Sequence, residues 1–179
     1  MTLESLCQVM SPPDAPFEQG RIEEWHGVEQ EIGTTLPKDY KNYINLFGTG
    51  CIGKFLWVFN PFSENENLNL PHQIGTQLDA IRVLQKQFGQ KCPYPIYPEP
   101  EGLLPWGLTD NGDVLFWCMS GEPEDWKVVI HEARGTNYEE YSYGVTGFLY
   151  NLILGNIESK IIPYDFLDKN TLFLPPKNP

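Results

Sequence analysis

The sequence lacks the features that define several large classes of protein. Its four cysteines are far apart, with no Cys-x-x-Cys pair and no histidine at ligand spacing, which argues against a disulfide framework and a zinc site. No run approaches the roughly 18 apolar residues that cross a membrane. The first 16 residues lack the basic and apolar regions of a signal peptide. We therefore expect free thiols, no bound metal and a cytoplasmic location.

Positive charge is also scarce. The chain has 12 Lys and Arg against 24 Asp and Glu, which gives a formal net charge of −12. A protein that binds nucleic acid directly needs a basic face, and so does one that binds an anionic membrane, so we expect neither partner. The charge is compatible with a basic protein partner. It also matches the simpler explanation that acidic proteins stay soluble through self-repulsion.

The distribution of the negative charge is more informative than its total. Residues 99–140 hold ten acidic and two basic residues, and so carry two thirds of the net negative charge in less than a quarter of the chain. Opposite charges on two proteins speed their encounter and favour correct pairing. This stretch is therefore a better candidate for an interface than an evenly acidic surface.

The length of 179 residues predicts one domain that spans residues 1–179. Area scaling lets a chain of this size bury about 70% of its extended surface, so it needs no crosslinks. We expect residues 1–17 to form a proline-rich lead-in and residues 158–179 to form a tail. Within that tail, Ile161-Ile162 and Phe166-Leu167 are expected to pack back on the domain.

Hydrophobic periodicity predicts an α+β fold. Helices are expected over residues 18–32, 37–47, 73–88 and 145–157, and strands over residues 55–59, 104–109, 114–119, 126–131 and 138–142. In the first three helices, helical spacing places these side chains on the inward face: Ile22, Trp25, Val28 or Glu29, and Ile32; Tyr40, Tyr43, Ile44 and Phe47; Ile74, Leu78, Ile81, Leu84 or Gln85, and Phe88. Gly89 is the expected C-cap of the third helix. Asn111-Gly112 suits a type I′ hairpin turn between the second and third strands. The order implies an antiparallel or mixed sheet of about five to six strands, with helices packed mainly on one side.

One glycine-rich segment resembles a phosphate-binding loop. Residues 48–54, GTGCIGK, match both G-x-G-x-x-G and G-x-x-x-x-G-K. However, Phe55 stands where a Ser or Thr would bind Mg²⁺, a helical pattern precedes the loop, and no helix follows it. The preferred interpretation is a glycine turn from helix to strand. An enzyme that uses this loop to bind a nucleotide remains a third hypothesis.

Other catalytic patterns have little support. There is no G-x-S-x-G elbow, and His26, His72 and His131 fall on separate predicted elements. The Asp110–Asp113 turn resembles a calcium loop only briefly, because Cys118 falls where a bidentate Glu is required. We therefore expect no catalytic residue, no cofactor and no enzymatic activity.

Two segments place acidic residues beside aromatic ones, as protein interfaces often do. They are Glu122-Pro-Glu124-Asp125-Trp126 and Tyr138-Glu-Glu-Tyr141. The alternative is that the aromatic rings face the core and the acids face solvent. The interface hypothesis makes Trp126 the aromatic anchor and names these partner-binding residues: Asp110, Asp113, Glu122, Glu124, Asp125, Trp126, Glu139 and Glu140.

Two blocks resemble the SUKH superfamily of binding domains. In the first, VEQEIGTTLPKDYKNYINLFGTG at residues 28–50 is similar to the family's opening helix pair. In the second, LLPWGLTDNGDVLFW at residues 103–117, followed by TGFL at 146–149, is similar to its hairpin and closing helix. Residues 60–102 and the tail beyond residue 158 depart from the compact pattern, and resemble additions.

The resemblance implies a binding protein without catalytic residues. Bacterial members of the superfamily resemble immunity proteins that neutralise a cognate toxin, often a nuclease, and one branch resembles a fungal regulator of cell-wall assembly. The leading hypothesis is thus an immunity protein whose acidic surface binds a basic toxin domain. The alternative is a regulatory or scaffolding module without a toxin partner.

Overall fold

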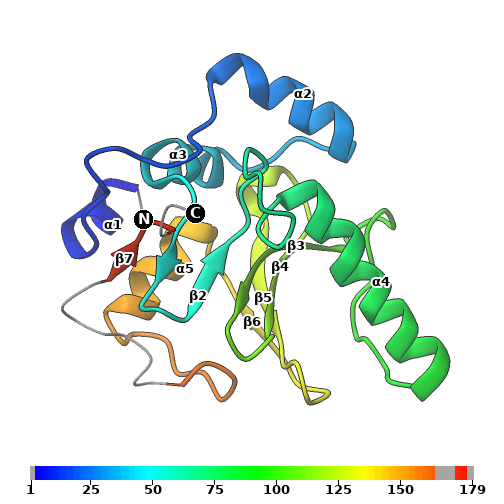
Figure 1. The fold of residues 1–179 in the computed structure, drawn as a ribbon. Coiled ribbons are helices and arrows are strands. Elements are labelled where there is room, and N and C mark those ends of the chain that lie inside the picture. Colours follow the sequence, from blue (N-terminus) through cyan, green and yellow to red (C-terminus); the bar gives the residue numbers. More distant parts are fainter. Residues whose placement is uncertain (1–2, 164–171, 177–179) are drawn as a thin grey trace.

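The computed structural model describes residues 3–163 and 172–176. This part of the chain forms five α-helices and seven strands (Figure 1). The helices are α1 (Leu3–Val9), α2 (Ile22–Ile32), α3 (Lys38–Phe47), α4 (Leu70–Phe88) and α5 (Val145–Ile153). The strands are β1 (Cys51–Ile52), β2 (Leu56–Val58), β3 (Leu103–Thr109), β4 (Val114–Cys118), β5 (Lys127–His131), β6 (Tyr138–Tyr141) and β7 (Phe173–Leu174).

The strands form a single antiparallel sheet in the order β6-β5-β4-β3-β2-β1-β7. The predicted α+β class is therefore confirmed, and the sheet has more strands than expected. The additional strands, β1 and β7, have two residues each. Such short strands carry no alternating pattern, so hydrophobic periodicity could not reveal them.

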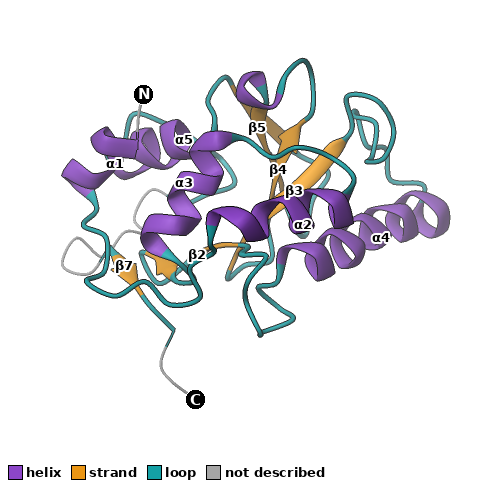
Figure 2. Ribbon diagram, turned by 90° about the horizontal axis from the view of Figure 1, so that it is seen from above, coloured by secondary structure: helices purple, strands orange, loops and turns teal. Residues whose placement is uncertain are grey.

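Both faces of the sheet are covered. Successive side chains of β4 alternate, so that Leu115 and Trp117 enter one core while Val114 and Phe116 enter the other. The larger core lies beneath α1, α3 and α5, as expected for helices mainly on one side. On the opposite face, α4 packs on β3 through a smaller core (Figure 2).

The N-terminal region differs from the expected lead-in. Residues 3–9 form α1, which packs against α5 and α3. Leu6 and Met10 are almost fully buried, so this segment belongs to the main core. At the other end, Ile161 and Ile162 are buried as predicted. The prediction for Phe166-Leu167 falls outside the described residues.

The helix pair at residues 22–47 forms with corrected bounds. Helix α2 begins at Ile22 instead of residue 18, because Arg21 is its N-cap and Glu18 has a positive φ of 57°. Ile22 is 81% exposed, not inward as predicted. It is the first residue of α2, and the buried residues of this helix begin at Trp25. In α3, all four predicted core residues are buried: Tyr40, Tyr43, Ile44 and Phe47.

Helix α4 is longer than predicted and only partly packed. Its side chains Leu78 and Ile81 are buried against the sheet, as expected. Gly89 ends the helix in the left-handed conformation, also as expected. Phe88 is 73% exposed, against the prediction, because the last turns of α4 extend past the sheet (Figure 1).

Two turns settle local predictions. In the β3–β4 hairpin only Gly112 has a positive φ, 89°, and its N–H donates to Thr109 O at 2.8 Å. The turn is therefore not type I′, which needs positive φ at both central residues. The glycine segment at residues 48–54 leads from α3 into β1 and then β2, with no receiving helix. The helix-to-strand interpretation of that segment is confirmed.

Candidate protein-binding groove

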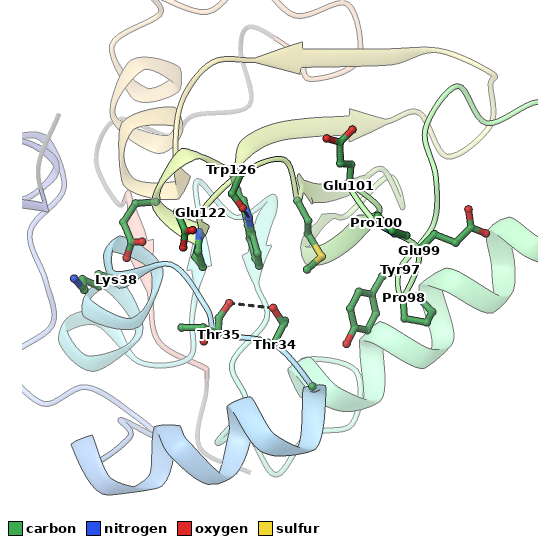
Figure 3. Close-up of a pocket in the computed structure, with 15 residues that line it drawn as sticks. Thr34, Thr35, Lys38, Tyr97, Pro98, Glu99, Pro100, Glu101, Glu122 and Trp126 are labelled. Carbon is green, nitrogen blue, oxygen red and sulfur yellow. Dashed lines mark hydrogen bonds between the residues drawn. The ribbon is translucent and has the colours of Figure 1, made fainter.

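An open groove of about 710 Å³ lies at one end of the sheet, between three segments. Figure 3 shows Thr34 and Thr35 of the α2–α3 turn on one wall, Tyr97 to Glu101 on another, and the Trp126 ring between them. The lining residues are Gly33, Thr34, Thr35, Lys38, Tyr97, Pro98, Glu99, Pro100, Glu101, Met119, Gly121, Glu122, Pro123, Glu124 and Trp126.

The α2–α3 turn forms a rigid first wall. Gly33 ends α2 in the left-handed conformation that glycine adopts without strain, at φ 88°. Glu29 then crosses the turn, because its Oε1 accepts from Leu36 N at 2.9 Å and from Lys41 Nζ at 2.7 Å. These bonds fix the backbone between the two helices. The side chains of Thr35 and Lys38 remain exposed at the groove.

The second wall is the proline-rich segment before β3. Its Tyr97 donates its hydroxyl to Ile32 O at 2.6 Å and thereby joins this wall to the end of α2. The Tyr97 carbonyl accepts from Arg82 Nη2 of α4 at 3.0 Å. Glu99 and Glu101 follow on exposed turns, so their carboxylates lie at the rim.

Trp126 forms part of the groove floor, and its burial corrects the prediction that it is an exposed anchor. Only 4% of the residue is exposed, and its ring lies 6.0 Å from that of Trp117 in the main core. Its Nε1 donates to Gly121 O at 3.4 Å, which holds the preceding loop. The core interpretation of this tryptophan is therefore the correct one.

The short 3-10 helix η1 (Pro123–Asp125) sets the third wall. It follows Glu122 directly, and the turn directs Glu122 and Glu124 to the groove. Asp125 is exposed on the same turn but does not line the groove. The structure thus brings together two of the predicted acids and the edge of Trp126.

The other predicted residues lie elsewhere. Asp110 and Asp113 flank the β3–β4 turn, whereas Glu122 follows β4, so the two groups occupy opposite ends of that strand. Glu139 and Glu140 are neighbours on β6, where alternation directs their side chains to opposite faces. The acidic stretch is continuous in the sequence but is not one surface.

Those outlying acids are already bound within the chain. Asp113 is 4% exposed and accepts from Thr109 Oγ1 at 2.7 Å and from Ala133 N at 3.0 Å, so it cannot meet a partner as predicted. Asp110 accepts from Trp57 Nε1 at 2.8 Å.

The two acids of β6 are bound in the same way. Glu139 accepts from Ser159 Oγ at 2.6 Å and from Lys160 N at 2.7 Å, and so holds the segment after α5. Glu140 pairs with Lys127 at 2.8 Å, and the hydrogen bond from that ammonium lowers the pKa of Glu140.

The acids of the groove are bound much less. Among the described residues, the carboxylates of Glu99, Glu122 and Glu124 have no hydrogen-bond or ion-pair partner, and Glu101 has one contact of 3.5 Å with Ser120 Oγ. Lys38 is the one basic residue in the lining. Apolar surface below and carboxylates above suit Lys and Arg, whose stems are apolar and whose ends are cationic.

Sequence reasoning missed half of this groove. Glu99 and Glu101 belong to the acidic stretch but are not among the predicted binding residues, and no sequence pattern marks Thr34 and Thr35 as binding residues. Two sequence features could have indicated these walls. A glycine after α2 and a proline-rich segment before β3 are both typical of exposed loops, where binding residues often lie.

The lining of the groove offers no conventional catalytic set, since it has no histidine and no cysteine. His131 lies apart from it, stacked on Tyr138 with ring centres 4.4 Å apart, and burial lowers the pKa of His131. Within residues 3–163 and 172–176, no three His, Cys, Asp or Glu side chains gather as a metal site. No described helix has the length and apolarity needed to cross a membrane.

Comparison with known families identifies the domain. The family model SUKH_6, described as SMI1-KNR4 cell-wall, matches residues 22–149, which run from the start of α2 into α5. All three walls of the groove lie within this range. No curated protein and no solved structure matches the chain significantly. The chain therefore belongs to the SUKH superfamily.

Proposed function

We propose that this protein is a non-enzymatic, cytoplasmic immunity protein that binds a basic toxin domain and neutralises it. Membership of the SUKH superfamily supports the class of function. The observation that carries the proposal is the set of carboxylates around the groove that have few or no partners. Four of the other predicted acids, Asp110, Asp113, Glu139 and Glu140, already have partners in the chain, and Asp125 is exposed beside the groove. A nuclease suits such a surface, since its own active face must be basic to hold nucleic acid.

Neutralisation would occur by occupation. The four groove carboxylates would pair with Lys and Arg side chains on the toxin and exclude its substrate from that face. Their field would also speed association at low salt, as it does in other complexes of opposite charge. This mechanism needs no catalytic residue and no cofactor.

A growth assay tests the proposal. A basic toxin domain encoded beside this gene would be co-expressed with the wild-type chain or with the double variant Glu122→Lys/Glu124→Lys. The wild type should restore growth, and the double variant should not. The control is Glu64→Lys/Glu66→Lys, which has the same spacing, the same change in charge and exposed side chains outside the groove.

The control variant should protect the cells as well as the wild type does. Equal loss of protection in both variants would show that only total charge matters, and would remove the groove from the mechanism. Failure of the wild-type chain to protect cells from the toxin would contradict the proposed function itself.

The cell-wall description of the matching family favours one alternative, a regulatory or scaffolding module without a toxin partner. Gene neighbourhood separates the two functions. An adjacent toxin gene supports immunity, whereas its absence supports the regulatory role.

A further inference from the structure

We propose that the groove takes an extended segment of the partner whose alternate side chains are basic, and that one of these enters a second pocket beside Asp39. This inference rests on the proposed function and specifies the chemistry of the partner at the same site. Three features of the structure lead to it: the shape of the groove, the placement of its charges, and an unpaired oxygen in the adjoining pocket.

The shape comes first. The groove is open to solvent and lies between two loops, the α2–α3 turn and the proline-rich segment, with η1 as its third wall. The hydrogen bond from Tyr97 to Ile32 fixes the distance between these walls. A channel bounded by two fixed loops suits a single extended chain better than the convex face of a folded domain. Side chains of such a chain alternate, with neighbours on one side about 7 Å apart.

The charges come second. Glu99 and Glu101 lie on the proline-rich wall, and Glu122 and Glu124 on the wall formed at η1, so a segment in the groove meets carboxylates from two of its three walls. Glu99 and Glu101 are two residues apart, and so are Glu122 and Glu124. The apolar floor, with Met119 and Trp126, would contact the stems of the basic side chains, as Lys and Arg stems commonly do elsewhere.

The pocket comes third. It has a volume of about 280 Å³, lies between α3 and the start of α5, and shares Pro123 and Glu124 with the groove. Asp39 lines it and accepts through Oδ2 from Thr146 N at 3.0 Å and from Thr146 Oγ1 at 3.1 Å. Its other oxygen, Oδ1, is buried and has no hydrogen-bond partner among the described residues.

An unpaired buried carboxylate oxygen is costly, and a cationic donor would satisfy it. The pocket lining holds two carboxylates, those of Asp39 and Glu124, and no basic side chain. A guanidinium group presents several N–H donors in one plane, which suits a site lined by more than one carboxylate. We therefore assign this pocket to an arginine side chain of the bound segment.

Peptide binding by fluorescence anisotropy tests the inference on the full chain. The probe is a labelled peptide of sequence Arg-Thr-Arg-Thr-Arg-Thr-Arg. The comparison peptide has the same composition in blocks, Arg-Arg-Arg-Arg-Thr-Thr-Thr. Opposite charge alone attracts both equally, so the alternating peptide should bind at least about fivefold more tightly only if spacing is recognised.

Two variants test where the peptide binds. Glu122→Gln/Glu124→Gln should weaken binding at least about tenfold, and Asp39→Asn about tenfold, as for a lost charge-assisted hydrogen bond. Asn can still accept from Thr146, so the start of α5 remains capped. Circular dichroism melting verifies that each variant is folded. Glu64→Gln/Glu66→Gln is the matched control and should bind as the wild type does.

The outcomes separate the inference from the proposed function. Equal affinity for both peptides, or unchanged affinity in the groove variants, overturns the inference. If the chain neutralises its toxin but binds neither peptide, the inference fails and the proposed function stands. If the alternating peptide binds as described but no toxin is neutralised, the proposed function fails and the groove assignment stands.

Discussion

Replacement of Trp126 by alanine separates a core role from a binding role. The residue is 4% exposed and packs on Trp117. An aromatic side chain buries about 150–250 Å², which at about 25 cal/mol per Å² corresponds to about 4–6 kcal/mol. The remaining Cβ and partial collapse of the cavity reduce this value, so we expect Trp126→Ala to lower the free energy of unfolding by about 3–5 kcal/mol.

Urea denaturation followed by far-UV circular dichroism measures this loss. With a slope of about 2 kcal/mol per M, the midpoint should fall by about 1.5–2.5 M. Trp126→Phe retains most of the packing and loses only the 3.4 Å bond to Gly121, so it should cost about 1 kcal/mol. Trp57→Ala is the control, because Trp57 is only half-buried at β2 and should cost less than Trp126→Ala.

One result would refute the core role of Trp126. If Trp126→Ala shifts the midpoint by less than about 0.5 M and yet abolishes partner binding, the side chain is a contact residue and not a core residue. A large shift in the midpoint together with weaker binding would agree with the burial described above.

Four further predictions concern pH, the segment after α5, the sheet and α2. Burial lowers the pKa of His131 below its unfolded value, so its contribution to stability is complete above about pH 6.5 and is lost as the pH falls toward the folded pKa. The urea midpoint of His131→Asn should therefore change less between about pH 7.5 and pH 5.5 than that of the wild type. Glu139→Ala removes the acceptor that holds residues 159–162, so hydrogen exchange there should accelerate, whereas unchanged protection would contradict that role. In Gly107→Ala the new Cβ would lie 2.7 Å from a backbone oxygen of β2, which should cost about 1–3 kcal/mol in thermal unfolding. Gly27→Ala meets no atom within 4 Å and should instead stabilise α2 by about 0.5–1 kcal/mol.

Local patterns predicted much of the fold because they are physical requirements of the elements. The apolar side of α3 was predictable because helical spacing places Tyr40, Tyr43, Ile44 and Phe47 together. The central strands β3 to β5 were predictable from their aromatic and β-branched residues. The same reasoning could have placed Trp126 correctly, since it shares its parity with Val128 and Ile130, which both enter the main core.

The groove itself was only half predictable. Glu122 and Glu124 were identified by their charge, but their isolation from other groups depends on contacts between distant segments. The bond from Tyr97 to Ile32 spans 65 residues, and that from Thr146 to Asp39 spans 107. No local pattern indicates which acids such contacts satisfy and which they leave open.

The sheet is covered on one face by α1, α3 and α5 and on the other by α4. Because helices cover both faces, the sheet presents no broad surface to a partner, and a partner would contact the loops at the ends of the strands. Substitutions at those loop positions would alter which protein is bound, while the buried residues beneath them would maintain the same fold.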